Sequence, residues 1–317
     1  DGIRDLVRSR GLGDVYKRQQ YMATVKTVKR NWKETNEKYI KRGEFFINPS
    51  FLDSWLDEIN QMNKRKVGEP YLYPNSMIEF SAYFHCKGFD YRGCEGILRG
   101  LSKLFQIPFP VICYTQICRR INKLNIQFDF IEENLVVGID GTGEKVSNRG
   151  EWIRQKWKVR RGWIKVVIMG SKNGIVDLRI GNENLDERKA GRVMIKKHHK
   201  KIKKVLADSF HDCRDTFNLC EEYNLETAIK IRKGASIRAR NSPRRKHEVI
   251  KYQNMEHPEW VKTTGYGYRW PLTEGHFSGC KRLFGEYVRA TKKRNMYKEV
   301  KLKFWAYNNL LRIGKSN

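Results

Sequence analysis

Two short apolar segments that each lead into an aspartate limit most strongly how this chain can fold. Leu135–Ile139 is an apolar run typical of a strand and is followed by Asp140, and Lys204–Ala207 is another and is followed by Asp208. Ligands of open α/β sheets gather at the carboxyl ends of the strands. The sequence therefore predicts that the two carboxylates meet at one edge of a sheet, although they are far apart along the chain.

A third acid, Glu274, opens a predicted helix, and Lys281 follows two turns later on the same face. Three converging carboxylates form an oxygen-rich site of the kind that Mg²⁺ prefers. Two such ions, ~3.5–4 Å apart, activate the attacking oxygen and stabilise the leaving one in a displacement at phosphorus. Taken singly, each acid is better explained as a surface group or an ion-pair partner, because a chain with 35 acidic residues contains many such triples.

The rest of the C-terminal half predicts strands and helices in a mixed order, which indicates an α/β sheet domain. Its last part, from about residue 272 to 311, has the pattern of helices. The other predicted elements are strands over 163–168, 175–180 and 226–231, helices over 186–200 and 216–223, and a basic exposed loop over 233–245.

The N-terminal part, residues 20–130, has a helical pattern. Asn48-Pro49 predicts one helix start, and the capping-box pattern from Ser76 to Glu79 predicts a second. Two further helices are expected over 94–105 and 115–124, and the latter carries Arg119 and Arg120. Paired arginines on the second of two short helices suggest a helix-turn-helix that binds DNA, and an ordinary helical bundle with surface arginines explains the pattern equally well.

The charge of the chain points to a polyanionic partner. It has 64 Lys and Arg against 35 Asp and Glu, a formal net charge of +29. Nucleic acid is the polyanion expected, because each phosphate neutralised by Lys or Arg releases bound counterions. A membrane partner is not expected, since no apolar run has the length of a span and no basic helix has a clean apolar face. Seven cysteines without a C-x-x-C pair suit reduced thiols in a cytoplasmic protein.

The first nineteen residues are set apart from the rest. Residues 1–19, ending in the sequence DVYKRQ, resemble the translation of a sequencing-library adapter. We expect this head to be an artefact and exclude it from the predicted fold.

Three groups of motifs, taken together and in this order, carry a family resemblance. Around the first acid the sequence is DGTG, then RGEW, then RRGWIK; around the second it is ADSFHD; the third region contains YGYRWPLTEGHFS and then KRLFGE. Over about residues 30–312 the chain resembles the DDE transposases of bacterial and archaeal insertion sequences. The C-terminal block is the most specific part of the resemblance.

The resemblance implies a ribonuclease-H-like catalytic domain over residues 131–317, with a mixed five-stranded sheet and C-terminal helices, preceded by a helical DNA-binding domain over 20–130. It implies that Asp140, Asp208 and Glu274 are catalytic and bind the metal, as two Mg²⁺ or Mn²⁺ ions. The resemblance and the basic pattern together predict seven DNA-contacting residues: Tyr266, Arg269, Lys281, Arg119, Arg120, Arg160 and Arg161.

The chain departs from the family pattern at several positions. Gly141 follows the first aspartate where the family has Ser or Thr, and four residues instead of three separate Arg269 from the glutamate. Tyr266, Arg269 and Lys281 resemble the family's tyrosine–arginine–glutamate–lysine signature, and Tyr268 is an alternative to Tyr266 as its tyrosine. Asp212 is the rival for the second metal ligand. Trp270 is either a base-stacking residue or a core aromatic.

The sequence therefore predicts a transposase that cleaves DNA at terminal inverted repeats and transfers the strands into target DNA. We expect it to act as a homodimer on double-stranded DNA, in the cytoplasm and on the nucleoid of a prokaryote. Two alternatives stay open at this point. One is a metal-dependent DNA nuclease of the same fold that does not join strands, and the other is an inactive transposase-derived DNA-binding protein.

Overall fold

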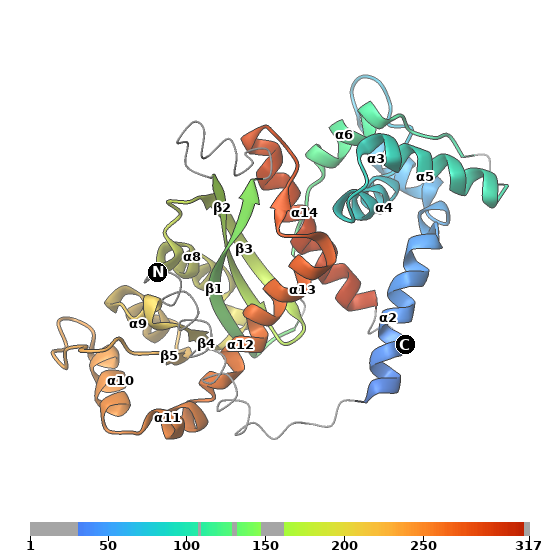
Figure 1. Cartoon of the computed structure of the whole chain (residues 1–317). Helices are drawn as coiled ribbons and strands as arrows, with labels where there is room; N and C mark the ends of the chain where they lie inside the picture. The colour runs from blue at the N-terminus through green and yellow to red at the C-terminus, as the bar shows by residue number, and fades with distance from the viewer. Residues whose placement is uncertain (1–30, 107–108, 129–131, 147–161, 314–317) are drawn as a thin grey trace, which may run out of the picture.

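The structure is a computed structural model that describes residues 31–106, 109–128, 132–146 and 162–313 (Figure 1). The adapter-like head at 1–19 and the predicted DNA contacts Arg160 and Arg161 lie outside these ranges. Figure 1 shows a central sheet with helices on both faces and a group of N-terminal helices beside it.

The sheet has the strand order β3-β2-β1-β4-β5, and a short strand, β6, pairs with β1. β1 pairs antiparallel with β2, and β2 antiparallel with β3, whereas the pairs β1–β4, β4–β5 and β1–β6 are parallel. This is the mixed sheet of the predicted ribonuclease-H-like fold. The strands are β1 (Leu135–Val146), β2 (Trp163–Ser171), β3 (Gly174–Asn182), β4 (Ile202–Ala207), β5 (Glu226–Ile229) and β6 (Tyr287–Val288).

Helices precede the sheet, cross over between its strands and follow it. The N-terminal helices are α2 (Trp32–Glu44), η1 (Phe45–Ile47), η2 (Ser50–Leu52), α3 (Trp55–Asn63), α4 (Asn75–Cys86), α5 (Tyr91–Leu104) and α6 (Tyr114–Lys123). Those between the strands are α8 (Glu187–His198), η3 (His199–Lys201), η4 (Ser209–His211) and α9 (Arg214–Glu222). The C-terminal ones are α10 (Pro243–Gln253), α11 (His257–Thr264), η5 (Tyr266–Tyr268), α12 (Arg269–Leu272), α13 (Glu274–Phe284) and α14 (Lys293–Ile313).

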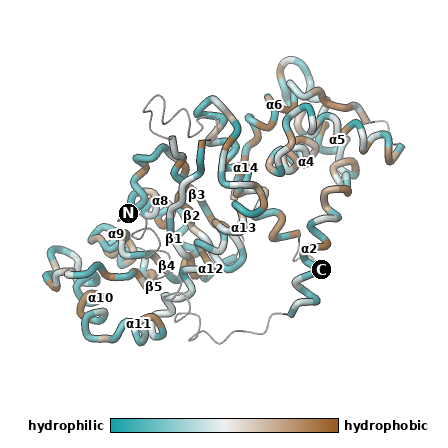
Figure 2. The backbone as a smooth tube through the Cα atoms, viewed as in Figure 1, coloured by the Kyte–Doolittle hydropathy of each residue, from teal (hydrophilic) through white to brown (hydrophobic). Residues whose placement is uncertain are grey.

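The sheet is buried on both faces because its central strands alternate between two hydrophobic cores. Along β2, Ile164, Val166 and Ile168 belong to the core with α13 and α14, whereas Val167 and Met169 belong to the core with α8. Figure 2 shows hydrophobic residues along these strands, in contrast to the largely hydrophilic loop that connects β5 to α10. Two covered faces leave the ends of the strands as the accessible part of the sheet.

β1 corrects one prediction. The apolar run predicted a strand that ends at Asp140, but β1 continues through Val146. The continuation is held by pairing with β2, where Asp140 lies opposite Ile168 and Lys145 opposite Trp163. The extra residues, GTGEKV, are polar or glycine except for the final valine and show no apolar alternation, so only the neighbouring strand reveals that they are extended.

One predicted helix start was wrong, and a second, near Ser76, is confirmed by α4 but without the predicted cap. Ser50–Leu52 forms a separate 3₁₀ turn, and the helix that was expected after Asn48-Pro49 begins at Trp55. The capping box at Ser76 does not form, because Ser76 donates its hydroxyl and its N–H to the carboxylate of Glu58. A side chain from another helix therefore caps α4 in place of a residue within it.

The N-terminal helices share one hydrophobic core with α14 and with one face of the sheet. Arg42 on α2 donates a 2.8 Å hydrogen bond to the Leu310 carbonyl on α14. Arg120 donates to the Tyr73 carbonyl and to Asn75, while Arg119 is exposed. Arg120 thus fastens the start of α4 to α6. DNA binding by Arg119 or Arg120 stays a prediction, and so does the domain boundary at residue 130.

Candidate active site

Asp140 and Asp208 lie side by side on neighbouring parallel strands. β1 and β4 pair with Ile139 opposite Ala207, so the residue after each of these occupies the same level of the sheet. Asp208 comes directly after β4, and its Oδ1 accepts a 3.0 Å hydrogen bond from the N–H of Phe210. The strand register therefore brings the two aspartates together, as the sequence predicted. Their role as metal ligands stays a prediction.

Two glycines that pair across β1 and β2 let the chain before Glu274 lie directly on the sheet. Gly138 lies opposite Gly170. A Cβ at position 138 would lie 2.8 Å from Cγ2 of Thr273, and one at position 170 would lie 1.9 Å from the carbonyl oxygen of Leu272. Only residues without a Cβ permit this approach. The end of α12 thus rests on the strands and places Glu274, the first residue of α13, next to β1.

Arg269 connects the first and third carboxylates. Its NH1 donates to Oδ2 of Asp140 at 2.6 Å, and its NH2 lies 3.6 Å from Oε1 of Glu274. The side chains of Arg269 and Asp140 are 16% and 18% exposed, whereas that of Glu274 is 40% exposed. The cluster is therefore shielded at Asp140 and open to solvent at Glu274. We call Asp140, Asp208, Glu274 and Arg269 the carboxylate site.

The electrostatics of Asp140 favour a cation beside it. Burial raises the pKa of Asp140, and the negative charges of Asp208 and Glu187 raise it further, against the opposing effects of Arg269 and the Gly141 N–H. The net direction is upward. A carboxylate that is destabilised by burial and by neighbouring carboxylates gains from any positive charge brought next to it.

Two family models, both described as Transposase DDE domain, match the chain. The first matches residues 40–149, and the second matches residues 132–309, which is more than half of the chain. This chain belongs to the DDE transposases. Membership implies a DNA substrate, phosphoryl-transfer chemistry and dependence on a divalent metal ion. Of the helices in the described ranges, none combines the length and the apolar character that crossing a membrane requires.

The transposase compensates for the missing side chain at Gly141 with a residue from another element. A Cβ at this position would lie 2.6 Å from Oε2 of Glu187, the first residue of α8. Lys165 lies 3.1 Å from the same carboxylate, and the buried ring of His211 lies 3.7 Å from its other oxygen. Glu187 thus occupies the space next to Gly141. The sequence showed the departure at Gly141 but did not predict this neighbour, because only the folded structure places α8 beside β1.

Residues of the predicted tyrosine–arginine–glutamate–lysine signature surround the site in this transposase. The ring of Tyr266 lies 5.8 Å from the guanidinium of Arg269. Lys281, on the same helix as the glutamate, donates to Oγ1 of Thr142 at 3.0 Å and to the carbonyl of Gly143 at 3.1 Å. Lys281 therefore packs against β1 just beyond the first aspartate. Contact of these three residues with DNA stays a prediction.

The alternatives raised from the sequence have different surroundings. Asp212, the rival metal ligand, accepts two hydrogen bonds from Arg245, at 2.7 and 3.0 Å, and one from the N–H of Arg232. Its oxygens are committed to these partners, so it is a structural ion-pair residue. Tyr268 is exposed, and Trp270 is 45% exposed, which contradicts the interpretation of Trp270 as a core aromatic.

The donor set of the transposase fits a hard divalent cation. Asp140, Asp208 and Glu274 offer only carboxylate oxygens, the ligands that Mg²⁺ prefers, and the cationic Arg269 already lies against two of them. In the part of the chain that the structure describes, no three His, Cys, Asp or Glu side chains lie close enough together to hold a metal ion.

Proposed function

We propose that this transposase cleaves DNA at the terminal inverted repeats of its element and joins the freed ends to a target duplex. The observation that supports this best is that the register of β1 and β4 brings Asp140 and Asp208 together, while Arg269 contacts both Asp140 and Glu274. These three acids would hold two Mg²⁺ or Mn²⁺ ions. Bound ions supply the positive charge that activates the attacking oxygen and stabilises the leaving oxygen.

The reaction consists of two displacements at phosphorus. Water attacks a phosphodiester at each end, a new P–O bond forms, the bond to the 3′ oxygen breaks, and a 3′-hydroxyl is released. That hydroxyl attacks a target phosphodiester in the same manner and joins the strands. Because the oxygen nucleophiles come from water and DNA, no Ser or Tyr of the protein forms a covalent intermediate. Positioning and charge supply most of the catalysis of phosphoryl transfer.

The remaining parts of the chain would hold and select the DNA. Arg269 and Lys281 would contact phosphates near the cut, and the basic segments at 196–204 and 238–246 would hold the backbone. The helical N-terminal part would recognise the inverted repeats. Since two ends must be processed together, we expect a homodimer on DNA.

Cleavage of a supercoiled plasmid that carries the ends of the element tests this proposal. The unmodified protein should nick and cut the plasmid only with Mg²⁺ or Mn²⁺, and Glu274→Gln should reduce the rate at least 100-fold, since loss of an outer-shell partner of a metal ligand alone costs ~10–100-fold. Glu259→Gln is the matched control, because Glu259 is an exposed acid on α11. Its cleavage rate should stay unchanged.

The products decide between the proposal and its two alternatives. Transfer of labelled 3′ ends into a second plasmid supports the transposase. Metal-dependent cleavage without any joined product would leave only the nuclease. DNA binding without cleavage by any variant would leave only the DNA-binding protein, and equal cleavage by Glu274→Gln would remove Glu274 from the site.

A further inference from the structure

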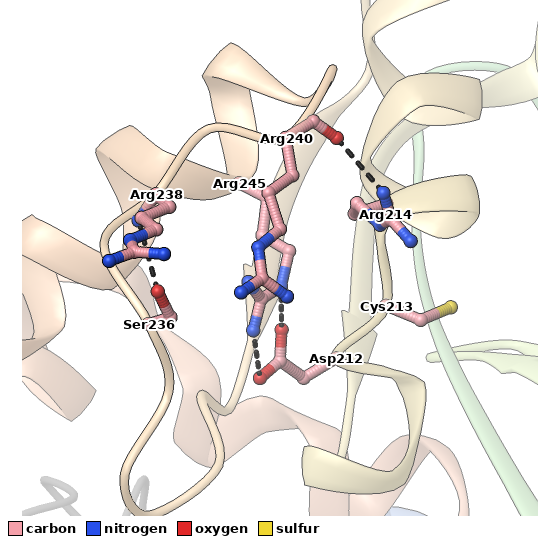
Figure 3. A pocket seen from close by; sticks show the side chains of 7 residues that line it. All are labelled: Asp212, Cys213, Arg214, Ser236, Arg238, Arg240 and Arg245. Atoms are coloured by element: carbon pink, nitrogen blue, oxygen red, sulfur yellow. Dashed lines mark hydrogen bonds and ion pairs between the residues drawn. The ribbon is translucent and has the colours of Figure 1, made fainter.

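A second charged site lies at the opposite end of η4 from Asp208. It is a pocket of about 200 Å³ between the start of α9 and the loop that leads to α10. This volume is far larger than the ~10–15 Å³ of cavity that is needed to hold one water molecule. We call it the arginine pocket, and its lining residues are Asp212, Cys213, Arg214, Ser236, Arg238, Arg240 and Arg245 (Figure 3).

Four arginines and one carboxylate are among the residues that line the arginine pocket. That carboxylate, Asp212, is neutralised by its two hydrogen bonds with Arg245, and its side chain is fully buried. Figure 3 shows the two side chains directed toward each other, and it shows Arg214 directed toward the backbone of Arg240, to which it donates at 3.1 Å. The pocket therefore holds an excess of positive charge.

Arg238 and Arg240 carry that excess. Within the described ranges, neither guanidinium makes a hydrogen bond or an ion pair with the protein. The backbone that presents them is unusual, because Arg240 has a φ of 44°, in the left-handed region that side chains other than Asn and Asp rarely adopt. Strain of this kind is retained where the surrounding structure requires a particular geometry, which often serves binding.

We propose that the arginine pocket binds a backbone phosphate of DNA. This inference rests on the proposed function, which takes DNA as the substrate and the segment 238–246 as a backbone contact, and deepens it by assigning one phosphate to a defined pocket. Guanidinium groups match the oxygens of a phosphodiester and form paired, charge-assisted hydrogen bonds with them. The first turn of α9 adds to the site, because its cap residue Cys213 lines the pocket and no side chain caps its N–H groups.

The pocket is connected to the carboxylate site through a short, braced segment. Asp208 and Asp212 lie at the two ends of η4. Arg232 fixes this turn by donating to the carbonyls of Ser209, at 2.8 Å, and Phe210, at 2.9 Å. A phosphate held in the pocket therefore sets the position of a DNA strand relative to Asp208, so the pocket orients DNA that reaches the carboxylate site.

The salt dependence of DNA binding by the full chain tests the proposal. The pocket variant is Arg238→Gln with Arg240→Asn, and Asn is chosen because it tolerates left-handed backbone. The control is Lys292→Gln with Arg294→Gln, which removes the same charge from exposed positions beside α14. Fluorescence anisotropy at increasing NaCl gives the slope of log affinity against log salt for a duplex of the element's end and for an unrelated duplex.

We expect the slope of the pocket variant to become shallower by about 1, the change that follows from losing one phosphate contact. A change with the end duplex alone assigns the phosphate to the element's end, and a change with both duplexes shows that target DNA is held too. Slopes equal to those of the control variant with both duplexes would overturn the proposal.

Inorganic phosphate provides a readout without DNA. Phosphate should raise the melting temperature of the unmodified protein and of the control variant above that in chloride of equal ionic strength, and the pocket variant should lose this shift. An equal shift in the pocket variant would contradict the proposal. Failure of the pocket and failure of the proposed function remain distinguishable, since Glu274→Gln tests cleavage and leaves all four arginines in place.

Discussion

The carboxylate site and the arginine pocket have opposite charge arrangements. In the first, the guanidinium of Arg269 contacts two of the three carboxylates, and in the second, four arginines and the single carboxylate of Asp212 line one pocket. The excess charge is negative in one site and positive in the other. The first therefore suits metal cations and the second suits phosphate, and the η4 segment between Asp208 and Asp212 connects them.

The single residue of opposite charge, Asp212 in the arginine pocket and Arg269 in the carboxylate site, has different surroundings in the two sites. Both oxygens of Asp212 are used by Arg245 and by the Arg232 N–H, and its side chain is fully buried. Arg269 lies between partners that are unequally exposed, and Glu274 is its loosest contact. The comparison teaches that Asp212 is part of the permanent structure, whereas Arg269 lies between a shielded and an exposed carboxylate.

The largest expected effect on stability comes from removing the negative charge of Asp212, the one carboxylate of the arginine pocket. Asp212→Asn should lower the free energy of unfolding by ~3–5 kcal/mol, because it leaves the charge of Arg245 shielded and unpaired. Adding Arg245→Gln should recover a large part of that loss, which urea unfolding at neutral pH measures. In Asp208→Asn, by contrast, the loss should be close to zero, because Asn accepts the same capping hydrogen bond about as well as Asp. Equal losses in Asp212→Asn and Asp208→Asn would break the comparison.

The next effect tests whether packing assembles the carboxylate site. Gly170→Ala should destabilise the protein by about 3 kcal/mol, the upper end of the range for overpacking, because its Cβ would lie 1.9 Å from a backbone oxygen. It should also slow cleavage, since α12 and with it Glu274 must move away from β1. Gly100→Ala, where a Cβ meets no atom within 4 Å on α5, is the matched control and should leave cleavage unchanged. Normal cleavage by Gly170→Ala would show that the glycine pair does not position Glu274.

The smallest expected effect on stability comes from the ion pairs of Asp177, which lie outside both sites and serve as a reference for the other two predictions. Asp177 on β3 contacts Lys197 and His198, each at 3.0 Å. Burial raises the pKa of Asp177, but the hydrogen bonds from His198 and Lys197 outweigh it and lower the pKa to about 2. Against an unfolded value of ~3.9, this stabilises the fold by about 2 kcal/mol above pH 4.

Because the folded pKa of Asp177 is the lower one, this stability is lost as the pH falls from about 4 toward 2. Asp177→Asn should therefore be about 2 kcal/mol less stable than the unmodified protein at pH 7, and the two should converge near pH 2. Unfolding curves across this range measure the difference. A difference that does not change with pH would show that the ion pairs contribute nothing.

The sequence predicted the elements that carry their own signal. The apolar runs before Asp140 and Asp208 correspond to β1 and β4, and the helix expected over 186–200 corresponds to α8. It did not predict that β1 continues past Asp140, nor that Glu58 caps α4. In both cases the deciding partner lies on another element, and periodicity along one segment contains no information about that partner.

The sequence by itself determined the family, the mixed sheet and the acids that the strands carry, because hydrophobic periodicity and motif order are local properties of the chain. Tertiary structure alone decided that Gly138 and Gly170 form the surface on which the chain before Glu274 rests, and that Glu187 fills the space beside Gly141. It also decided that the arginines of three separate segments line one pocket. These features depend on contacts between distant segments, and only the packed sheet and helices bring those segments together.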